Sequence, residues 1–391
     1  MKKPVTVQRG TPDFLLLILT LLLVAFGLVM VFSASSSMTV VSEKYGYDAM
    51  YFTRKQLLWA GIGIFAMLIL MNIPYELFKK WFAPFLFLTI GLLVVVLFVG
   101  ENINGARSWI GIGGLGIQPT EFAKLAVVLY LAAIIAKKDE KFREFKRGLL
   151  PVMIMIGLIA FLIMLQPDLG SCLILLMCAF FIILAGGSNL KHVFLSVLVI
   201  IGIGALGFSL YVLANPDFTG GYRLARITSF WDPLADEQGH GYHLTQSLAA
   251  FGHGGLTGAG LGNSVQKLFY LPYAYNDFIF AVIAEELGFI GTSIFLLFYL
   301  LFLWRALIVA LRCPDIYGTL VGVGIVSMIG VQALINMGGV SGAIPVTGVT
   351  LPFISYGGSS MLVSLLAMGI LLSVSREYNR TLYAKKSDGT A

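Results

Sequence analysis

Residues 14–32, FLLLILTLLLVAFGLVMVF, form an uninterrupted run of 19 residues without a charge. At a rise of 1.5 Å per residue, a helix of this length crosses the ~30 Å hydrocarbon core of a bilayer. The run is longer than the apolar core of a typical signal peptide, and further apolar runs follow it. We therefore interpret it as an uncleaved first transmembrane helix. The small residues at 33–35 leave cleavage there as an alternative.

The composition extends this interpretation to the whole chain. Of its 391 residues, 58% are hydrophobic and 12% are charged, against roughly 45–50% and about 25% in soluble globular domains. Apolar stretches of helical length recur along the chain, so we predict an all-α integral membrane protein, a polytopic bundle of about ten transmembrane helices. The predicted spans are 13–35, 56–74, 81–100, 119–136, 149–165, 169–187, 192–214, 277–304, 318–338 and 354–375.

The distribution of basic residues predicts the orientation. With the N-terminus in the cytoplasm, 18 of the 26 Lys and Arg fall in cytoplasmic segments, as the positive-inside rule requires. Both ends are basic, which predicts an even number of spans. We expect one domain over residues 1–391, with cytoplasmic tails at 1–12 and 377–391 and a large extracellular loop at 215–275, between spans 7 and 8. Because the basic residues are segregated by loop, the net charge of +6 does not indicate nucleic acid binding.

The stretch LPYAYNDFIFAVIAEELG, residues 271–288, places three carboxylates where a loop becomes an apolar helix. If the helix begins near Asn276, Glu285 lies about 12 Å deeper than Asp277. Paired glycosidase carboxylates lie only roughly 5–9.5 Å apart, so a catalytic Asp277 would act without an acid partner on its own helix. Capping of the helix by Asn276 or Asp277 is an equally compatible interpretation. Glu285 and Glu286 are expected to tie the helix to its neighbours, since intramembrane carboxylates need partners.

Other polar residues stand out against the apolar background. Glu121 and Lys124 are three residues apart on one face of the fourth span, and a structural ion pair is favoured over catalysis. Arg107 lies in an outer loop, and Asp168, in QPDLG, lies at an outer helix mouth. His240 and His243 share the large loop with His253, but no cysteine or HExxH helix accompanies them, so no metal site is predicted.

Two segments are rich in small residues, and their charges do not indicate what these segments do. FGHGGLTGAGLG, residues 251–262, belongs to the predicted long outer loop. Long ordered loops are usually functional, which is one interpretation of this segment. The alternative is that its glycines only form turns. Residues 316–375 contain no charge. We interpret 338–360 as an outer segment dipping into the protein, because irregular backbone at membrane depth must be buried or line a cavity. Close helix packing through Gly and Ser is the alternative.

Six motifs together resemble the FtsW/RodA/SpoVE (SEDS) family. They occur in the same order as in the family, and the resemblance extends over about residues 15 to 378, nearly the full length of the chain. DPLADEQGHGYHLTQSLAAFG (232–252) and the last motif resemble the FtsW/SpoVE branch more than RodA. The motifs are QPTEFAKL (118–125), QPDLG (166–170), GYRLARITSFWDP (221–233), GGLTGAGLGNSVQKLFYLP (254–272), DFIFAVIAEELG (277–288) and PVTGVTLPFISYGGSS (345–360).

This resemblance implies a peptidoglycan glycosyltransferase that polymerises lipid II on the outer face of the bacterial cytoplasmic membrane, for division, cell shape or sporulation. It implies that Asp277 is the essential residue, which we assign as the general base. The leaving pyrophosphate would be stabilised by cations. Candidate substrate-binding residues are Arg107, Arg223, Lys267, Gln266 and Ser360, and Mg²⁺ or Mn²⁺ is a candidate cofactor.

The resemblance also implies partners: a class B penicillin-binding protein that crosslinks the new strand, and other membrane proteins of the divisome or elongasome. Two functions of other classes stay open, a lipid II flippase and a non-catalytic divisome scaffold. A flippase needs polar groups along the whole transmembrane path, whereas the charged features here gather on the outer side.

Overall fold

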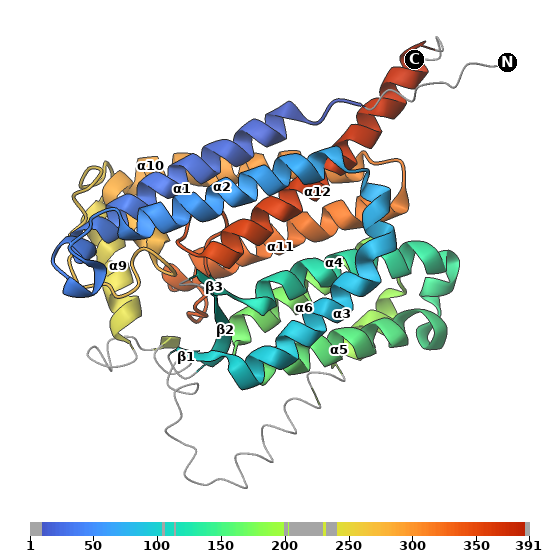
Figure 1. The fold of residues 1–391 in the computed structure, drawn as a ribbon, viewed down its shortest axis with the longest axis horizontal. Coiled ribbons are helices and arrows are strands. Elements are labelled where there is room, and N and C mark those ends of the chain that lie inside the picture. Colours follow the sequence, from blue (N-terminus) through green and yellow to red (C-terminus); the bar gives the residue numbers. More distant parts are fainter. Residues whose placement is uncertain are drawn as a thin grey trace, which may run out of the picture.

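The computed structural model describes residues 10–103, 106–112, 115–198, 202, 230–231 and 241–387. These residues form a bundle of long helices with three short strands at one end (Figure 1). The helices are α1 (Phe14–Val40), α2 (Tyr51–Asn72), α3 (Tyr75–Val99), α4 (Pro119–Lys138), α5 (Leu150–Met164), α6 (Leu169–Ala185), α9 (Tyr242–Gly254), α10 (Ile279–Leu311), α11 (Ile316–Val340) and α12 (Gly358–Ser387). Short helical turns lie at Glu43–Tyr45, Asp139–Arg143 and Phe145–Leu149.

Eight helices within the described residues are long and apolar enough to cross a membrane. They correspond to eight of the ten predicted spans, and the chain is a multi-pass membrane protein. The predicted span 169–187 is α6, which is apolar but has only 17 residues. The predicted span 192–214 and the first part of the predicted loop 215–275 lie mostly outside the described residues, as does most of the tail 1–12. Helix α12 continues to Ser387, well into the predicted tail 377–391.

Three helices form the centre of the bundle. Most of the apolar window of α4, α11 and α12 is buried, whereas α2 and α3 present most of theirs outward. Glycines allow this close packing: a Cβ at Gly322 would meet the Ala310 side chain at 2.4 Å, and one at Gly324 would meet Val128 at 2.6 Å. Small residues let membrane helices approach closely where lipid supplies no hydrophobic drive. Small residues therefore lie where the central helices meet their neighbours.

A small antiparallel sheet, which the all-α prediction did not include, follows α3. Its strands are β1 (Glu101–Ile103), β2 (Ala106–Ile112) and β3 (Leu115–Ile117), in the order β1-β2-β3. The sequence carries the signals of two tight hairpins, Asn-Gly at 104–105 and Gly-Gly at 113–114. Arg107 is exposed on β2. The predicted outer loop is thus a folded element that packs against α3, α4 and α12.

Helix α10 is broken at Gly288, whose φ of 65° and ψ of −172° are not helical. The glycine-rich run lies along the break and forms hydrogen bonds with the backbone groups of α10 on both sides of it. Ala259 and Gly260 N–H donate to the Glu285 and Glu286 carbonyls at 2.9 and 3.0 Å, while Phe289 and Ile290 N–H donate to the 255 and 256 carbonyls at 2.9 and 3.1 Å. The glycines therefore do more than form turns, because they let one backbone segment approach another.

Gly258 and Gly262 provide a test of this close approach. Both have a left-handed φ, +84° and +85°, but a Cβ at Gly258 would lie 2.2 Å from the Glu286 carbonyl oxygen, whereas one at Gly262 meets nothing within 4 Å. Both Ala substitutions incur about 1–2 kcal/mol of left-handed strain. Gly258→Ala is expected to cost a further ~1–3 kcal/mol through overpacking. Thermal melting in detergent measures the difference, and equal shifts for the two variants would contradict the packing described.

Candidate functional site

Asp277 lies in a turn immediately before α10 and is partly exposed. The helix begins at Ile279, three residues later than predicted, and its N-cap is Phe278, which makes no side-chain capping bond. The capping interpretation is therefore wrong for both Asn276 and Asp277. The turn itself is tight: Tyr273 has a φ of 57°, and its carbonyl accepts from Asn276 N–H at 2.9 Å. The Asp277 carboxylate is thus carried by a turn that precedes the helix.

The segment 341–357, between α11 and α12, packs against this turn. Asn336 Nδ2 donates to the Asp277 carbonyl at 2.7 Å and to the Val349 carbonyl at 2.7 Å. A Cβ added at Gly348 would lie 3.6 Å from Asp277 Oδ2, so the carboxylate faces bare backbone there. Most of 349–355 is buried without helical structure. This agrees with the predicted dipping segment, since its backbone is satisfied inside the protein.

An aromatic cluster joins the same two segments to the start of α2. The Phe52 ring stacks on Tyr275 at 4.3 Å and meets Tyr356 edge-on at 4.9 Å. Tyr356 N–H donates to the Tyr275 carbonyl at 3.0 Å. Burial, followed by the neighbouring Tyr51 and Tyr45, raises the pKa of Tyr356 to about 12, and burial also raises the pKa of Tyr275. Both phenols therefore stay neutral at physiological pH.

A second polar network lies deeper, between α4, α11 and α12. Lys124 Nζ donates to Glu121 at 2.9 Å and to Gln332 Oε1 at 2.6 Å. Gln332 Nε2 in turn donates to the Thr350 carbonyl at 3.0 Å and to Ser360 Oγ at 3.2 Å. Both residues of the buried ion pair thus belong to α4, and Gln332 links Lys124 to α11. Ser360, a predicted substrate-binding residue, belongs to this internal network.

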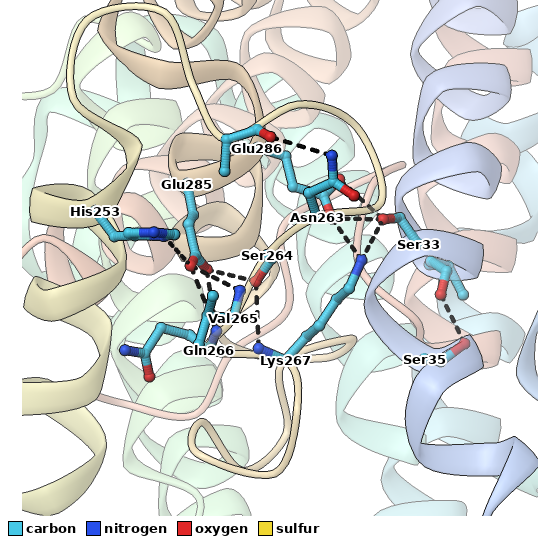
Figure 2. A network of polar contacts seen from close by, with 12 residues as sticks. Ser33, Ser35, His253, Asn263, Ser264, Val265, Gln266, Lys267, Glu285 and Glu286 are labelled. Carbon is cyan, nitrogen blue, oxygen red and sulfur yellow. Dashed lines mark hydrogen bonds and ion pairs between the residues drawn. The ribbon is translucent and has the colours of Figure 1, made fainter.

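Glu285 and Glu286, on the first turns of α10, each bind a different partner set (Figure 2). Glu285 accepts from Val265 N–H at 2.9 Å, from Ser264 Oγ and from Gln266 N–H, and lies 2.8 Å from His253 Nδ1. It therefore organises the loop before the Asp277 turn.

Glu286 accepts from Ser33 Oγ of α1 at 2.6 Å and from Lys267 Nζ at 2.8 Å. Both side chains of the Glu286–Lys267 pair are almost fully buried. The glutamate does tie α10 to a neighbouring helix. The expectation that Lys267 offers an outer-face cation to a substrate is wrong for this structure, because its charge is already paired inside the protein.

The remaining predicted residues belong to other elements or lie outside the described part of the chain. Asp168 caps α6, accepting from Ser171 N–H at 2.9 Å and from Gln118 Nε2 at 3.2 Å. Arg107 is exposed on β2, and the backbone N–H of Gln266 binds Glu285. Arg223 and His240 fall outside the described residues. Among the residues described, no group of three or more His, Cys, Asp and Glu could hold a metal ion.

Sequence reasoning missed three amides, on α2 and α11, that bind the backbone between α11 and α12. Gln332 and Asn336 are four residues apart on α11, and both bind the 349–350 backbone. Gln56 of α2 is fully buried; its Nε2 donates to the Ser355 carbonyl at 3.0 Å and its Oε1 accepts from Gly357 N–H at 3.2 Å. Isolated amides in apolar spans were the available signal, because a buried polar group requires a partner.

A cavity lies at the other end of α10, remote from Asp277. Its lining includes Asp13, Arg305 and Arg312. Asp13 caps α1 and forms an ion pair with Arg305 at 2.6 Å. Arg312 lies over the Tyr378 ring, and we interpret this cavity as a consequence of packing α1, α10 and α12 together at this end.

Comparison with known proteins agrees with the motifs. The family model for FtsW, RodA and SpoVE, described as "Cell cycle protein", matches residues 13–380. The chain is 46% identical to stage V sporulation protein E of Bacillus subtilis over 379 residues, covering 96% of this chain and 100% of that protein. It is 40% identical to the probable peptidoglycan glycosyltransferase FtsW of Trichlorobacter lovleyi, covering 93% of each chain.

A solved structure is also similar. A chain from the work "Structural coordination of polymerization and crosslinking by a peptidoglycan synthase complex" superposes with a TM-score of 0.75 at 30% identity, covering 94% of this chain and 98% of that one. Because the family model and the full-length relatives span nearly the whole sequence, this chain belongs to the FtsW/RodA/SpoVE family.

Proposed function

We propose that the chain is a peptidoglycan glycosyltransferase that polymerises lipid II into glycan strands on the outer face of the cytoplasmic membrane. Family membership and the printed function of the FtsW relatives support the enzyme class. The observation that carries the site is the position of Asp277: a partly exposed carboxylate on a turn that three buried segments hold in place. Division, cell shape and sporulation are the candidate roles.

In the proposed reaction, the 4-hydroxyl of an acceptor GlcNAc attacks C1 of the donor MurNAc and inverts it. The new C1–O bond forms as the bond from C1 to undecaprenyl pyrophosphate breaks. Asp277 takes the hydroxyl proton, as a general base must. The pyrophosphate leaves as an anion that is already a weak base, so no carboxylic acid is required to protonate it. This chemistry suits a carboxylate that has no acid partner on its own helix.

Stabilisation of the departing pyrophosphate requires positive charge. Of the three predicted cations, Lys267 is occupied by Glu286, and Arg107 is exposed at the outer end of the bundle. Arg107 is therefore the best candidate among the described residues. The residues described offer no cluster to hold Mg²⁺ or Mn²⁺, so we assign no step to a cation held by the protein.

The proposed orientation follows from charge: both termini are cytoplasmic and Asp277 faces outward. A class B penicillin-binding protein is the proposed partner, with other divisome or elongasome proteins. The similarity to a chain from a peptidoglycan synthase complex supports a crosslinking partner.

Purified chain in detergent, supplied with lipid II, tests the enzyme against its alternatives. Glycan strands separated by gel electrophoresis are expected, with a higher yield when the partner transpeptidase is added. A flippase has no bilayer to cross in detergent and would make no polymer. A scaffold would also make none, and would support cell growth without Asp277. Absence of strands with folded protein and partner present would reject the proposed activity.

A further inference from the structure

Asn336, on α11, holds two chain segments at once. Its side chain is almost completely buried. One amide group donates to the Asp277 carbonyl and to the Val349 carbonyl, both at 2.7 Å. Because both partners are carbonyl oxygens, only the NH₂ end of the amide can satisfy them, which fixes how the amide is oriented. Asn336 thus joins the turn that carries Asp277 to the segment 341–357.

The second bond of Asn336 also fixes what the Asp277 carboxylate faces. Val349 follows Gly348, the residue whose added Cβ would lie 3.6 Å from Asp277 Oδ2. One turn earlier on α11, Gln332 binds the next carbonyl, that of Thr350, at 3.0 Å. The two amides therefore set the 348–350 backbone against the carboxylate, but Asn336 is the one that also holds the Asp277 backbone.

The turn needs such an anchor. Asp277 precedes the N-cap of α10, so its position is not imposed by the helix, and the N-cap Phe278 contributes no side-chain bond. A reacting group displaced by about 1 Å can lose about 10²-fold in rate. A buried donor that fixes the Asp277 backbone would therefore act on the chemical step through Asp277 without touching the substrate.

We propose that Asn336 is a positioning residue for Asp277, which sets the distance of the carboxylate from the acceptor hydroxyl. This inference rests on the proposed role of Asp277 as the base. It predicts an effect on kcat that exceeds the effect on KM, whereas a residue needed only for folding changes the amount of active protein and leaves the kcat of the folded fraction unchanged.

The test compares Asn336→Leu, similar in volume, with Gln56→Leu. Gln56 is also a buried amide, and it makes two bonds to the neighbouring 355–357 backbone without contacting Asp277. Both variants are expected to melt at a lower temperature. In lipid II polymerisation normalised to folded protein, Asn336→Leu is expected to lose at least about tenfold in kcat, with KM within about threefold. Gln56→Leu is expected to keep kcat within about threefold.

Asn336→Ser retains one hydrogen-bond donor, and it replaces Asn336→Leu in the assay if the Leu variant does not fold. An intermediate kcat with unchanged KM supports the proposal, and a wild-type kcat with a lowered melting temperature overturns it. Wild type and Asp277→Asn are assayed in parallel. An inactive wild type rejects the proposed function, and an active Asp277→Asn rejects the base. If both behave as expected and Asn336→Leu matches Gln56→Leu in kcat, the positioning role of Asn336 alone is rejected.

Discussion

Asp277→Asn is expected to lower the rate of lipid II polymerisation by about 10²- to 10⁴-fold, the usual contribution of general-base catalysis. The amide keeps the shape of the side chain but cannot accept the proton of the acceptor hydroxyl. The Asp277 backbone carbonyl remains available to Asn336, so the turn should keep its conformation. The loss should appear in kcat, with the melting temperature in detergent close to that of wild type.

Asp168→Asn is the matched control for this substitution. Asp168 is another carboxylate just before a helix, but it caps α6 through Ser171 N–H and also accepts from Gln118. Its amide variant is expected to reduce stability by about 0.5–2 kcal/mol at most, because Asn also caps helices, and to keep polymerising. An Asp277→Asn protein that makes strands at a near-normal rate would refute the assignment.

Glu286→Ala is expected to be the most destabilising substitution, at about 3–5 kcal/mol. It would leave the Lys267 ammonium buried without its carboxylate, and breaking one partner of a buried pair costs that much. The same change removes the acceptor of Ser33 Oγ, and with it a link between α1 and the broken helix α10. Thermal or chaotrope unfolding in detergent measures the effect.

The double variant Glu286→Met with Lys267→Met distinguishes charge burial from loss of packing. Replacing a whole buried pair with apolar residues is often near neutral, so the double variant should recover most of the stability. Arg54→Met is an exposed control: Arg54 pairs with Asp48 at 3.2 Å but is 69% exposed, and surface pairs contribute about 0–1 kcal/mol. If Glu286→Ala melts like Arg54→Met, the buried pair does not stabilise the protein as described.

Helical spans were predictable because their signal is local. Nineteen uncharged residues are enough to recognise α1, and the same argument finds seven more described spans. The sheet after α3 was missed, although the Asn-Gly and Gly-Gly pairs in its sequence are also local signals. The start of α10 was placed three residues early, because Asn276 and Asp277 are good N-caps on average and the turn at Tyr273 overrides that preference.

Partners within the site were less predictable because they are distant in the sequence. The need of Glu286 for a partner follows from membrane physics, but Ser33 lies 253 residues away and nothing local indicates it. For the same reason Lys267 was assigned to the substrate, whereas its nearest carboxylate is Glu286. An isolated amide such as Asn336 in an apolar span signals that a partner is needed but does not show which one; its role appears only when Asp277 and Val349 are brought to it.

Labelling of Asp277→Cys in intact cells tests most directly whether residue 277 works on the outer side of the membrane. The three native cysteines are buried, so background should be low. Lys44→Cys, exposed in a predicted outer loop, and Lys80→Cys, exposed in a predicted cytoplasmic one, give the two reference levels. A membrane-impermeant maleimide is expected to label residue 277 without permeabilisation, as it labels residue 44. Labelling only after permeabilisation, as at residue 80, would contradict an outer-face base.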